Sequence, residues 1–89
     1  MNETQEANLE LSKLALESVR QLLPAKVQIE VSDYINEHNE WGLGVEVLID
    51  AIAEEKITIN AMQHQSLYAA ASTMNLSNTL DVLSGIKRK

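Results

Sequence analysis

The sequence predicts an all-α fold, a single small bundle of four to five helices. Apolar residues recur at spacings of three and four along most of the chain, which is the period of a helix with one buried face. Only one short segment alternates as a strand does, and no second segment is present to pair with it. The whole chain, residues 1–89, is expected to form one domain, because 89 residues is a single-domain length without linkers or repeats.

The first helix is expected from about Thr4 to Leu23, with Asn2 or Thr4 as its N-cap. Pro24 ends this helix and suits the first turn of the next one, since proline lacks an N–H donor. The apolar stripe of this helix consists of Leu11, Leu14, Ala15, Val19, Leu22 and Leu23.

The second helix, from Ala25 to Asn39, contains the one strand-like segment, VQIEV at residues 27–31. We predict a helix there, because a lone strand would leave its backbone groups unpaired. Ile29 then lies on the opposite face from the apolar stripe, which consists of Val27, Val31, Tyr34, Ile35 and His38.

The third helix is expected from Asn39 or Glu40 to Glu55. Gly42 and Gly44 lie in its first turn, where they favour the close approach of a neighbouring helix. Its core stripe consists of Trp41, the largest expected core anchor, with Val45, Leu48, Ile49 and Ile52.

The last two helices follow a short connection at residues 56–59. Asn60 is expected to cap the fourth helix, which runs to about residue 74, with Gln63 completing a capping box. Ser77 is expected to cap a short fifth helix that Gly85 terminates. The apolar residues of the fifth helix are Leu80, Leu83 and Ile86.

The net charge of −6 is unevenly distributed. Three of the seven basic residues form the tail at residues 87–89, which we expect to be frayed, and the remaining chain carries four bases against thirteen acids. Such a surface repels phosphate, which argues against binding nucleic acid. It attracts cationic proteins and accelerates encounter with them.

The acidity is concentrated between Val27 and Glu55, where eight carboxylates occur without a lysine or arginine. Many of them recur at spacings of three and four on two helices, so like charges repel one another by a few tenths of a kcal/mol per pair. A basic partner would relieve that repulsion. Leu43 and Val47 give this surface an apolar centre, unless another helix of the domain covers them. The predicted partner-binding residues are Glu30, Asp33, Glu37, Glu40, Leu43, Glu46, Val47, Asp50 and Glu54.

No constellation typical of catalysis is present. His38 continues an apolar stripe and is expected to be a half-buried core residue, whereas His64 is expected at the surface. The two have no metal-ligand spacing, and no nucleophile turn or phosphate-binding glycine loop occurs. We therefore expect no enzymatic activity, no metal and no cofactor. The polar N-terminus and the absence of cysteine and of long apolar runs favour a soluble cytoplasmic protein without a membrane partner. A monomer is favoured, and the oligomeric state is left open.

The run EWGLGVEVLID, residues 40–50, followed by the acidic pair at 54–55 and by Ile57 and Ile59, resembles small helical immunity proteins of the MafI and contact-dependent growth inhibition type. The resemblance covers about Val31 to Ile59. It departs from the family at Gly44, where that family is expected to have alanine.

The resemblance implies a bacterial immunity protein that binds and neutralises a cognate toxin domain. Many such toxins are nucleases with basic clefts that hold phosphate, so an acidic helical surface would block them by stoichiometric complex formation. Two other interpretations remain open at this point. One is a nucleic-acid mimic that inhibits a DNA- or RNA-binding protein, and the other is a homodimeric helical adaptor.

Overall fold

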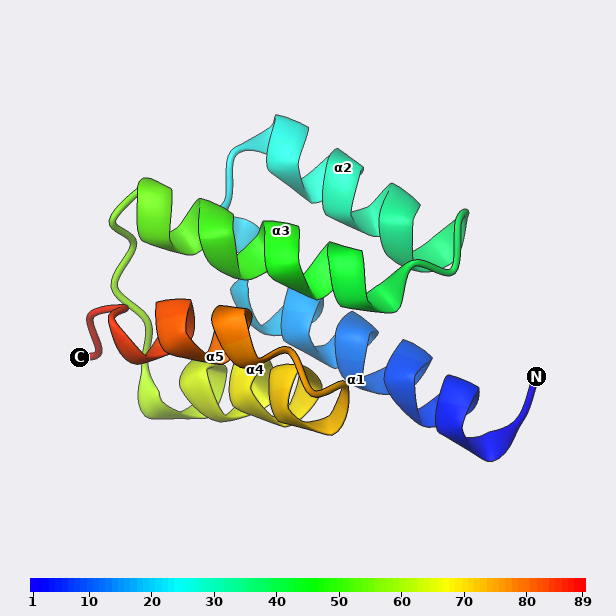
Figure 1. Cartoon of the computed structure of the whole chain (residues 1–89). Coiled ribbons are helices and arrows are strands. Elements are labelled where there is room, and N and C mark those ends of the chain that lie inside the picture. Colours follow the sequence, from blue (N-terminus) through cyan, green and yellow to red (C-terminus); the bar gives the residue numbers. More distant parts are fainter.

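The computed structural model describes residues 1–89 and contains five α-helices and one short 3-10 helix. No strand is present apart from one isolated bridge, so the prediction of an all-α bundle of four to five helices is confirmed. A membrane-crossing helix needs about 20 apolar residues, and no helix here has the required length and apolar character. In chain order the elements are α1 (Glu3–Val19), η1 (Arg20–Leu22), α2 (Ala25–Asn36), α3 (Trp41–Glu54), α4 (Ala61–Thr73) and α5 (Ser77–Ser84) (Figure 1).

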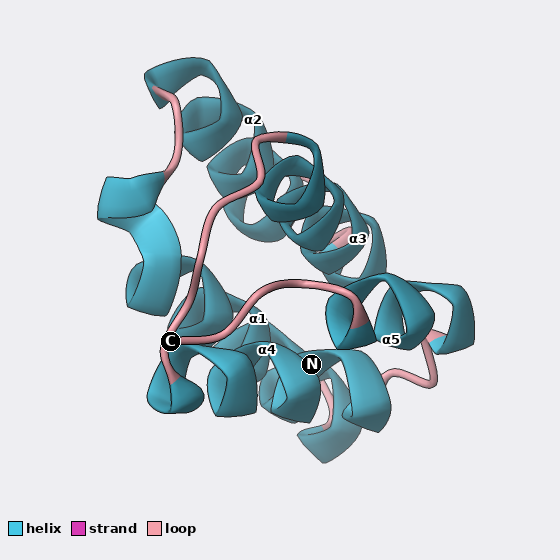
Figure 2. Ribbon diagram, turned by 90° about the vertical axis from the view of Figure 1, so that its left-hand side faces the viewer, coloured by secondary structure: helices cyan, strands magenta, loops and turns pink.

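Helices α2 and α3 form an antiparallel hairpin (Figure 1). Helices α1, α4 and α5 pack against α3 on the side opposite α2. The view in Figure 2 shows the same division, with α2 and α3 at the top, α1 and α4 below them and α5 beside them. The most extensive helix contact joins α1 and α4, which are far apart in the sequence. Helix α3 lies at the centre and contacts each of the other four α-helices.

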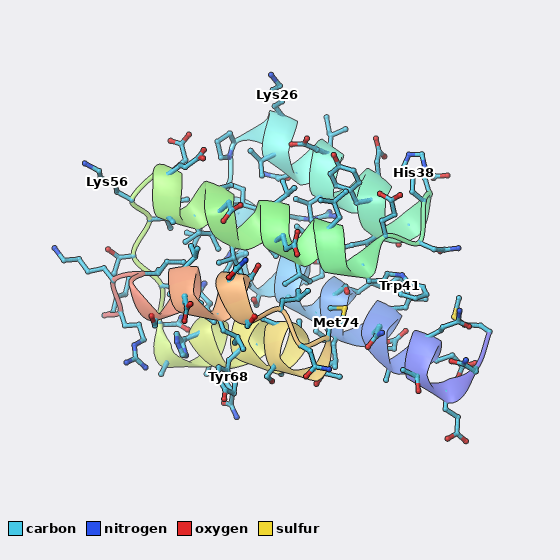
Figure 3. The ribbon with its side chains drawn as sticks, in the orientation of Figure 1. Lys26, His38, Trp41, Lys56, Tyr68 and Met74 are labelled. Atoms are coloured by element: carbon cyan, nitrogen blue, oxygen red, sulfur yellow. The ribbon has the colours of Figure 1, made fainter.

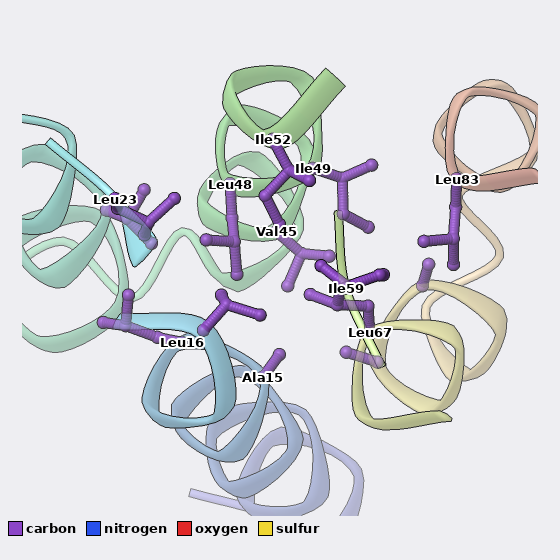
Figure 4. Packing of buried hydrophobic residues seen from close by; sticks show 14 of the residues in the cluster. Ala15, Leu16, Leu23, Val45, Leu48, Ile49, Ile52, Ile59, Leu67 and Leu83 are labelled. Atoms are coloured by element: carbon purple, nitrogen blue, oxygen red, sulfur yellow. The ribbon is translucent and has the colours of Figure 1, made fainter. Parts of the chain in front are cut away.

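The core is a cluster of sixteen buried hydrophobic residues to which α3 contributes the densest group. Burying one aliphatic side chain of this kind stabilises a fold by about 1.5–3 kcal/mol. Figure 4 shows the α3 residues pointing toward Leu16 of α1 and Leu67 of α4. The predicted core stripe of α3 is thus confirmed for the fully buried Val45, Leu48, Ile49 and Ile52.

Two capping boxes define where helices begin. The Asn2 side chain accepts a hydrogen bond from Gln5 N–H at 2.8 Å, and Gln5 Oε1 accepts one from Asn2 N–H at 3.0 Å. Asn60 and Gln63 repeat this arrangement at the start of α4, with both distances 2.8 Å. The prediction for Asn60 is confirmed, and Asn2 is the cap of α1. The prediction for Ser77 is wrong, because Ser77 is already helical and no side chain caps α5.

Residues 27–31 are helical, as predicted, and belong to α2. Ile29 is 64% exposed and lies away from the core, whereas Val31 is fully buried. The prediction for Leu14 of α1 is wrong, because this side chain is 59% exposed. Helix α1 buries a face centred on Ser12, Ala15 and Leu16 instead, so that Leu14 points to the opposite side.

The two glycines of α3 differ in their surroundings. A Cβ atom on Gly44 would lie 3.0 Å from Cγ1 of Ile35 and 3.4 Å from Cβ of Tyr34, so α2 crosses α3 at this point. The predicted close approach is confirmed at Gly44. It is wrong for Gly42, where a Cβ would meet only a side-chain carbon of Leu76 at an ordinary 3.6 Å.

The basic tail is paired with the α3–α4 connection, in contrast to the frayed end that we expected. Ile59 N–H donates to the carbonyl of Lys87 at 3.0 Å, and Lys89 N–H donates to the carbonyl of Ile59 at 2.9 Å. Ile86 is 7% exposed and packs in the core, as predicted. Gly85 follows α5 as its C-cap, also as predicted.

Deleting residues 87–89 is expected to accelerate hydrogen exchange at the Ile59 amide by about tenfold or more, because that amide loses its acceptor. The amide of Ile57, which donates to Ile52 at 3.0 Å, provides an internal control that should change little. Amide exchange measured by NMR tests this expectation. Equal Ile59 exchange rates in the full-length and shortened chains would show that the tail pairing contributes nothing.

Candidate functional site

The predicted partner-binding residues lie on α2, on α3 and on the turn between them. Glu30 and Asp33 belong to α2, Glu37 and Glu40 flank the turn, and the remaining residues belong to α3. We refer to this set as the acidic face. Since α2 and α3 are neighbouring antiparallel helices, the fold gathers both acidic segments onto one hairpin (Figure 1). On α3, Glu46 and Asp50 lie on the side that faces α5.

No carboxylate of the acidic face has a cationic partner within the chain. The only ion pair in the structure joins Glu17 and Arg20 at 3.3 Å, at the end of α1. Lys26 and Lys56, which bracket the acidic segment in the sequence, extend outward from the start of α2 and from beyond the end of α3 (Figure 3). The negative charge of the acidic face is therefore uncompensated at short range.

Leu43 and Val47 have different surroundings. Leu43 is 40% exposed and is one of the few large hydrophobic side chains of the protein that reach solvent. Val47 is half-buried and packs against the core cluster. The interpretation that neighbouring helices cover these residues therefore holds in part for Val47, and Leu43 is the apolar group that the acidic face offers to a partner.

Glu46 differs from the other six carboxylates because it is half-buried and lies against α5. It lines two shallow depressions of about 170 and 180 Å³ together with Asn78 and Thr79 from the first turn of α5, and Asp50 lines the first of them. Helix α5 has no side-chain cap, and a negative charge near a helix N-terminus is stabilising. Glu46 thus supports the fold, which makes it the least suitable residue of the acidic face for a test of binding.

His38 is exposed, so its prediction as a half-buried core residue is wrong. Helix α2 ends at Asn36, and Asn39 adopts a positive φ of 53° that turns the chain toward α3. His38 consequently lies beyond the helix whose apolar stripe it was expected to continue (Figure 3).

His64 is partly buried, in contrast to the surface position that we expected. Its ring stacks with that of Tyr68, with centroids 6.4 Å apart and an interplanar angle of 17°. Burial is the main cause that lowers the pKa of His64 from its ordinary 6.5, and the positive charge of Arg88 lowers this pKa further.

Because the pKa of His64 is lower in the folded than in the unfolded chain, protons bind first to the unfolded state as the pH falls below 6.5. The free energy of unfolding should have its full His64 contribution above pH 6.5 and lose it as the pH falls toward the folded-state pKa. Urea unfolding between pH 7 and pH 5.5 measures this slope. The slope should be smaller in His64→Gln, and identical slopes in the two proteins would contradict the assignment.

Trp41 is partly buried and packs against the core cluster, so the prediction of a core anchor is confirmed in part. Its indole Nε1 is buried without a hydrogen-bond partner. A buried unpaired donor of this kind costs about 1–3 kcal/mol. The apolar packing of the indole ring has to offset that cost.

Sequence reasoning missed an uncharged surface on α4. The segment from Ile57 to Leu80 contains no aspartate, glutamate, lysine or arginine, which the sequence alone already reveals. On α4 this segment exposes two large side chains, Met62 at 79% and Tyr68 at 53%. The protein therefore combines an acidic α2–α3 hairpin with a helix α4 that has no aspartate, glutamate, lysine or arginine of its own, and Arg88 of the tail lies beside His64 and Tyr68 of this helix.

In the whole chain, no group of three or more histidine, aspartate or glutamate side chains is arranged to hold a metal ion. Comparison with known proteins finds no family model, no curated protein and no solved structure that matches this chain.

Proposed function

We propose that this protein is an immunity protein, a stoichiometric inhibitor that binds a cationic bacterial toxin domain through the acidic face. The observation that carries the proposal is the set of seven carboxylates on two adjacent helices and the turn between them, with no ion pair inside the chain. A basic partner would supply the missing cations and remove the like-charge repulsion within each helix. Exposed Leu43 would supply an apolar contact inside an acidic rim.

A nuclease is the toxin class that best fits this surface. Nuclease clefts are positively charged because they hold the phosphate backbone, so an acidic protein surface competes for the same cleft. Binding of this kind needs no catalytic group and no cofactor in the inhibitor. It takes place in the cytoplasm, where a delivered toxin would meet its nucleic-acid substrate.

The test is a comparison of two baits in extracts of the native cell, the wild-type protein and a variant whose acidic face is reversed in charge. The expected result is a basic toxin domain that binds the wild-type bait at 1:1 stoichiometry, with a Kd that rises with salt, and that loses its toxicity in the complex. Capture of a host DNA-binding protein in its place would favour the nucleic-acid mimic. A toxin domain that binds both baits equally would refute the assigned surface.

The homodimeric adaptor is a second candidate, and the uncharged surface of α4 is the observation that favours it. Two molecules of net charge −6 repel each other, and contact through α4, which carries no acidic or basic side chain and exposes Met62 and Tyr68, would add least to that repulsion. Sedimentation at several concentrations tests this candidate. A dimer that Met62→Lys dissociates would support it, and a monomer at all concentrations would exclude it.

A further inference from the structure

The largest cavity of the protein lies at the end of the bundle where α3 and α5 both terminate. It has a volume of about 640 Å³, within the range of about 300–1,000 Å³ that small-molecule sites occupy. Its lining is half hydrophobic, and four of its apolar side chains are Ile52, Ile57, Val82 and Ile86. Figure 2 shows the two chain segments beside it, the α3–α4 connection and the segment after α5.

Backbone hydrogen bonds hold the walls of this cavity in place. Ile57 N–H donates to the carbonyl of Ile52 at 3.0 Å and fixes the chain where it leaves α3. The pairing of Ile59 with Lys87 and Lys89 then joins the α3–α4 connection to the tail. The small residues Ala53 and Gly85 leave the space between these walls unfilled. The cavity is thus formed before any ligand arrives, which reduces the ordering that binding requires.

The charge at this cavity is opposite to that of the rest of the protein. Lys56 and Lys87 line it with a single carboxylate, Asp81, and none of the three takes part in an ion pair. Lys56 extends into solvent at this end of the molecule (Figure 3). Arg88, the next residue, lies at a different depression beside His64 and Tyr68, so Lys56 and Lys87 are the cations of this cavity.

Three of the last four carbonyl groups of α3 and of α5 are already hydrogen-bonded beside this cavity. The carbonyls of Ala51, Ile52 and Ala53 accept hydrogen bonds from the three residues that follow α3. The carbonyls of Val82 and Leu83 accept from Gly85 and Ile86. An anionic group at the mouth of the cavity therefore meets the ammonium groups of Lys56 and Lys87 beside carbonyl groups that are mostly paired.

We propose that this cavity binds a small amphipathic anion, with its apolar part against the isoleucines and its carboxylate or other anionic head beside Lys56 and Lys87. This site lies apart from the acidic face and is independent of the proposed inhibitor function. A protein of net charge −6 otherwise attracts cations. If the cavity binds an anion more tightly than a cation of the same size, that preference comes from the cavity itself and not from the net charge of the protein.

Sodium octanoate, octyltrimethylammonium and octanol form a matched set of probes with the same alkyl chain and different charge. In an NMR titration with calorimetry, octanoate should bind at one saturable site and shift the amides of Ala53, Thr58 and Gly85. Octyltrimethylammonium should bind there at least about fivefold more weakly, because the two ammonium groups repel it. Tighter binding of the cation, shifts at other residues only, or no saturation with octanoate would overturn the proposal.

Variants distinguish the contribution of the lysine charges to binding from that of the apolar cavity. Lys56→Gln with Lys87→Gln should weaken octanoate binding at least about threefold and leave octanol binding unchanged, since only the attraction to the anion is lost. Lys13→Gln with Lys26→Gln changes the net charge equally and should leave both affinities unchanged. Ala53→Trp should abolish binding of octanoate and octanol by filling the cavity, with circular dichroism as the check of folding. Equal octanoate affinities in the two lysine double variants would refute the role of Lys56 and Lys87.

Discussion

Replacing Asp50 and Glu54 together by lysine is expected to slow association with the cationic partner by about ten- to a hundredfold at low salt. Electrostatic steering accelerates association by about 10- to 1,000-fold, and this double change turns part of an attractive field into a repulsive one. Both side chains are exposed, so no buried packing is lost. The difference between the two proteins should shrink as added salt screens the charges.

The same double change should preserve the fold. Asp50 and Glu54 repel each other one helical turn apart, and two lysines repel each other to the same degree. Positive charge toward the end of α3 is also favourable to the helix dipole. The melting temperature is therefore expected to stay the same or to rise slightly.

A second double variant with the same net charge tests whether the position of the charges matters or only their total. Glu6→Lys with Glu10→Lys changes the net charge by the same amount on exposed positions of α1. Stopped-flow association measured for both double variants should show a large effect only for the α3 pair. If both variants slow association equally, the partner responds to total charge and the acidic face is not its docking surface.

Gly44→Val is expected to lower the free energy of unfolding by about 1–3 kcal/mol, the usual cost of forcing extra carbon atoms into a packed contact. The first added carbon already lies 3.0 Å from Ile35, and the valine methyl groups would push α2 away from α3. For a domain of this size each kcal/mol shifts the melting temperature by about 4–8 °C.

Gly42→Ala provides the opposite expectation two residues earlier in the same helix. Its Cβ would make an ordinary 3.6 Å contact with Leu76, and alanine gains up to about 1 kcal/mol over glycine in a helix. Thermal and urea unfolding should show a lower free energy of unfolding for Gly44→Val and an equal or higher one for Gly42→Ala. An unchanged stability of Gly44→Val would show that α2 and α3 are not packed as described, and destabilisation by Gly42→Ala would show that the contact with Leu76 is tighter than described.

The sequence was sufficient for the fold class and for most of the helices because their signals are local. Apolar spacing, Pro24 and the Asn60–Gln63 box act within a few residues of the feature that they define. The choice of helix at residues 27–31 was also correct, because the absence of a partner strand is a property of the whole sequence. Leu14 was misplaced because periodicity predicts that a stripe exists, whereas the neighbouring helices decide which stripe is buried.

Features that depend on residues far apart in the chain were not predictable from local patterns. The bridge between Ile59 and Arg88 joins residues 29 positions apart, which no local pattern shows. The cavity between α3 and α5 arises from the same juxtaposition. For the acidic face, the sequence itself shows the lack of lysine and arginine. The difference in exposure between Leu43 and Val47 follows only from the packing of the helices.

The contact between α1 and α4 has a consequence for how the chain folds as it leaves the ribosome. The first helix emerges early, but its principal packing partner is made only when residues 61–73 have been synthesised. Until then the apolar side of α1 stays open to water and to chaperones. The core of the nascent chain therefore stays incomplete until α4 is available to pack on α1.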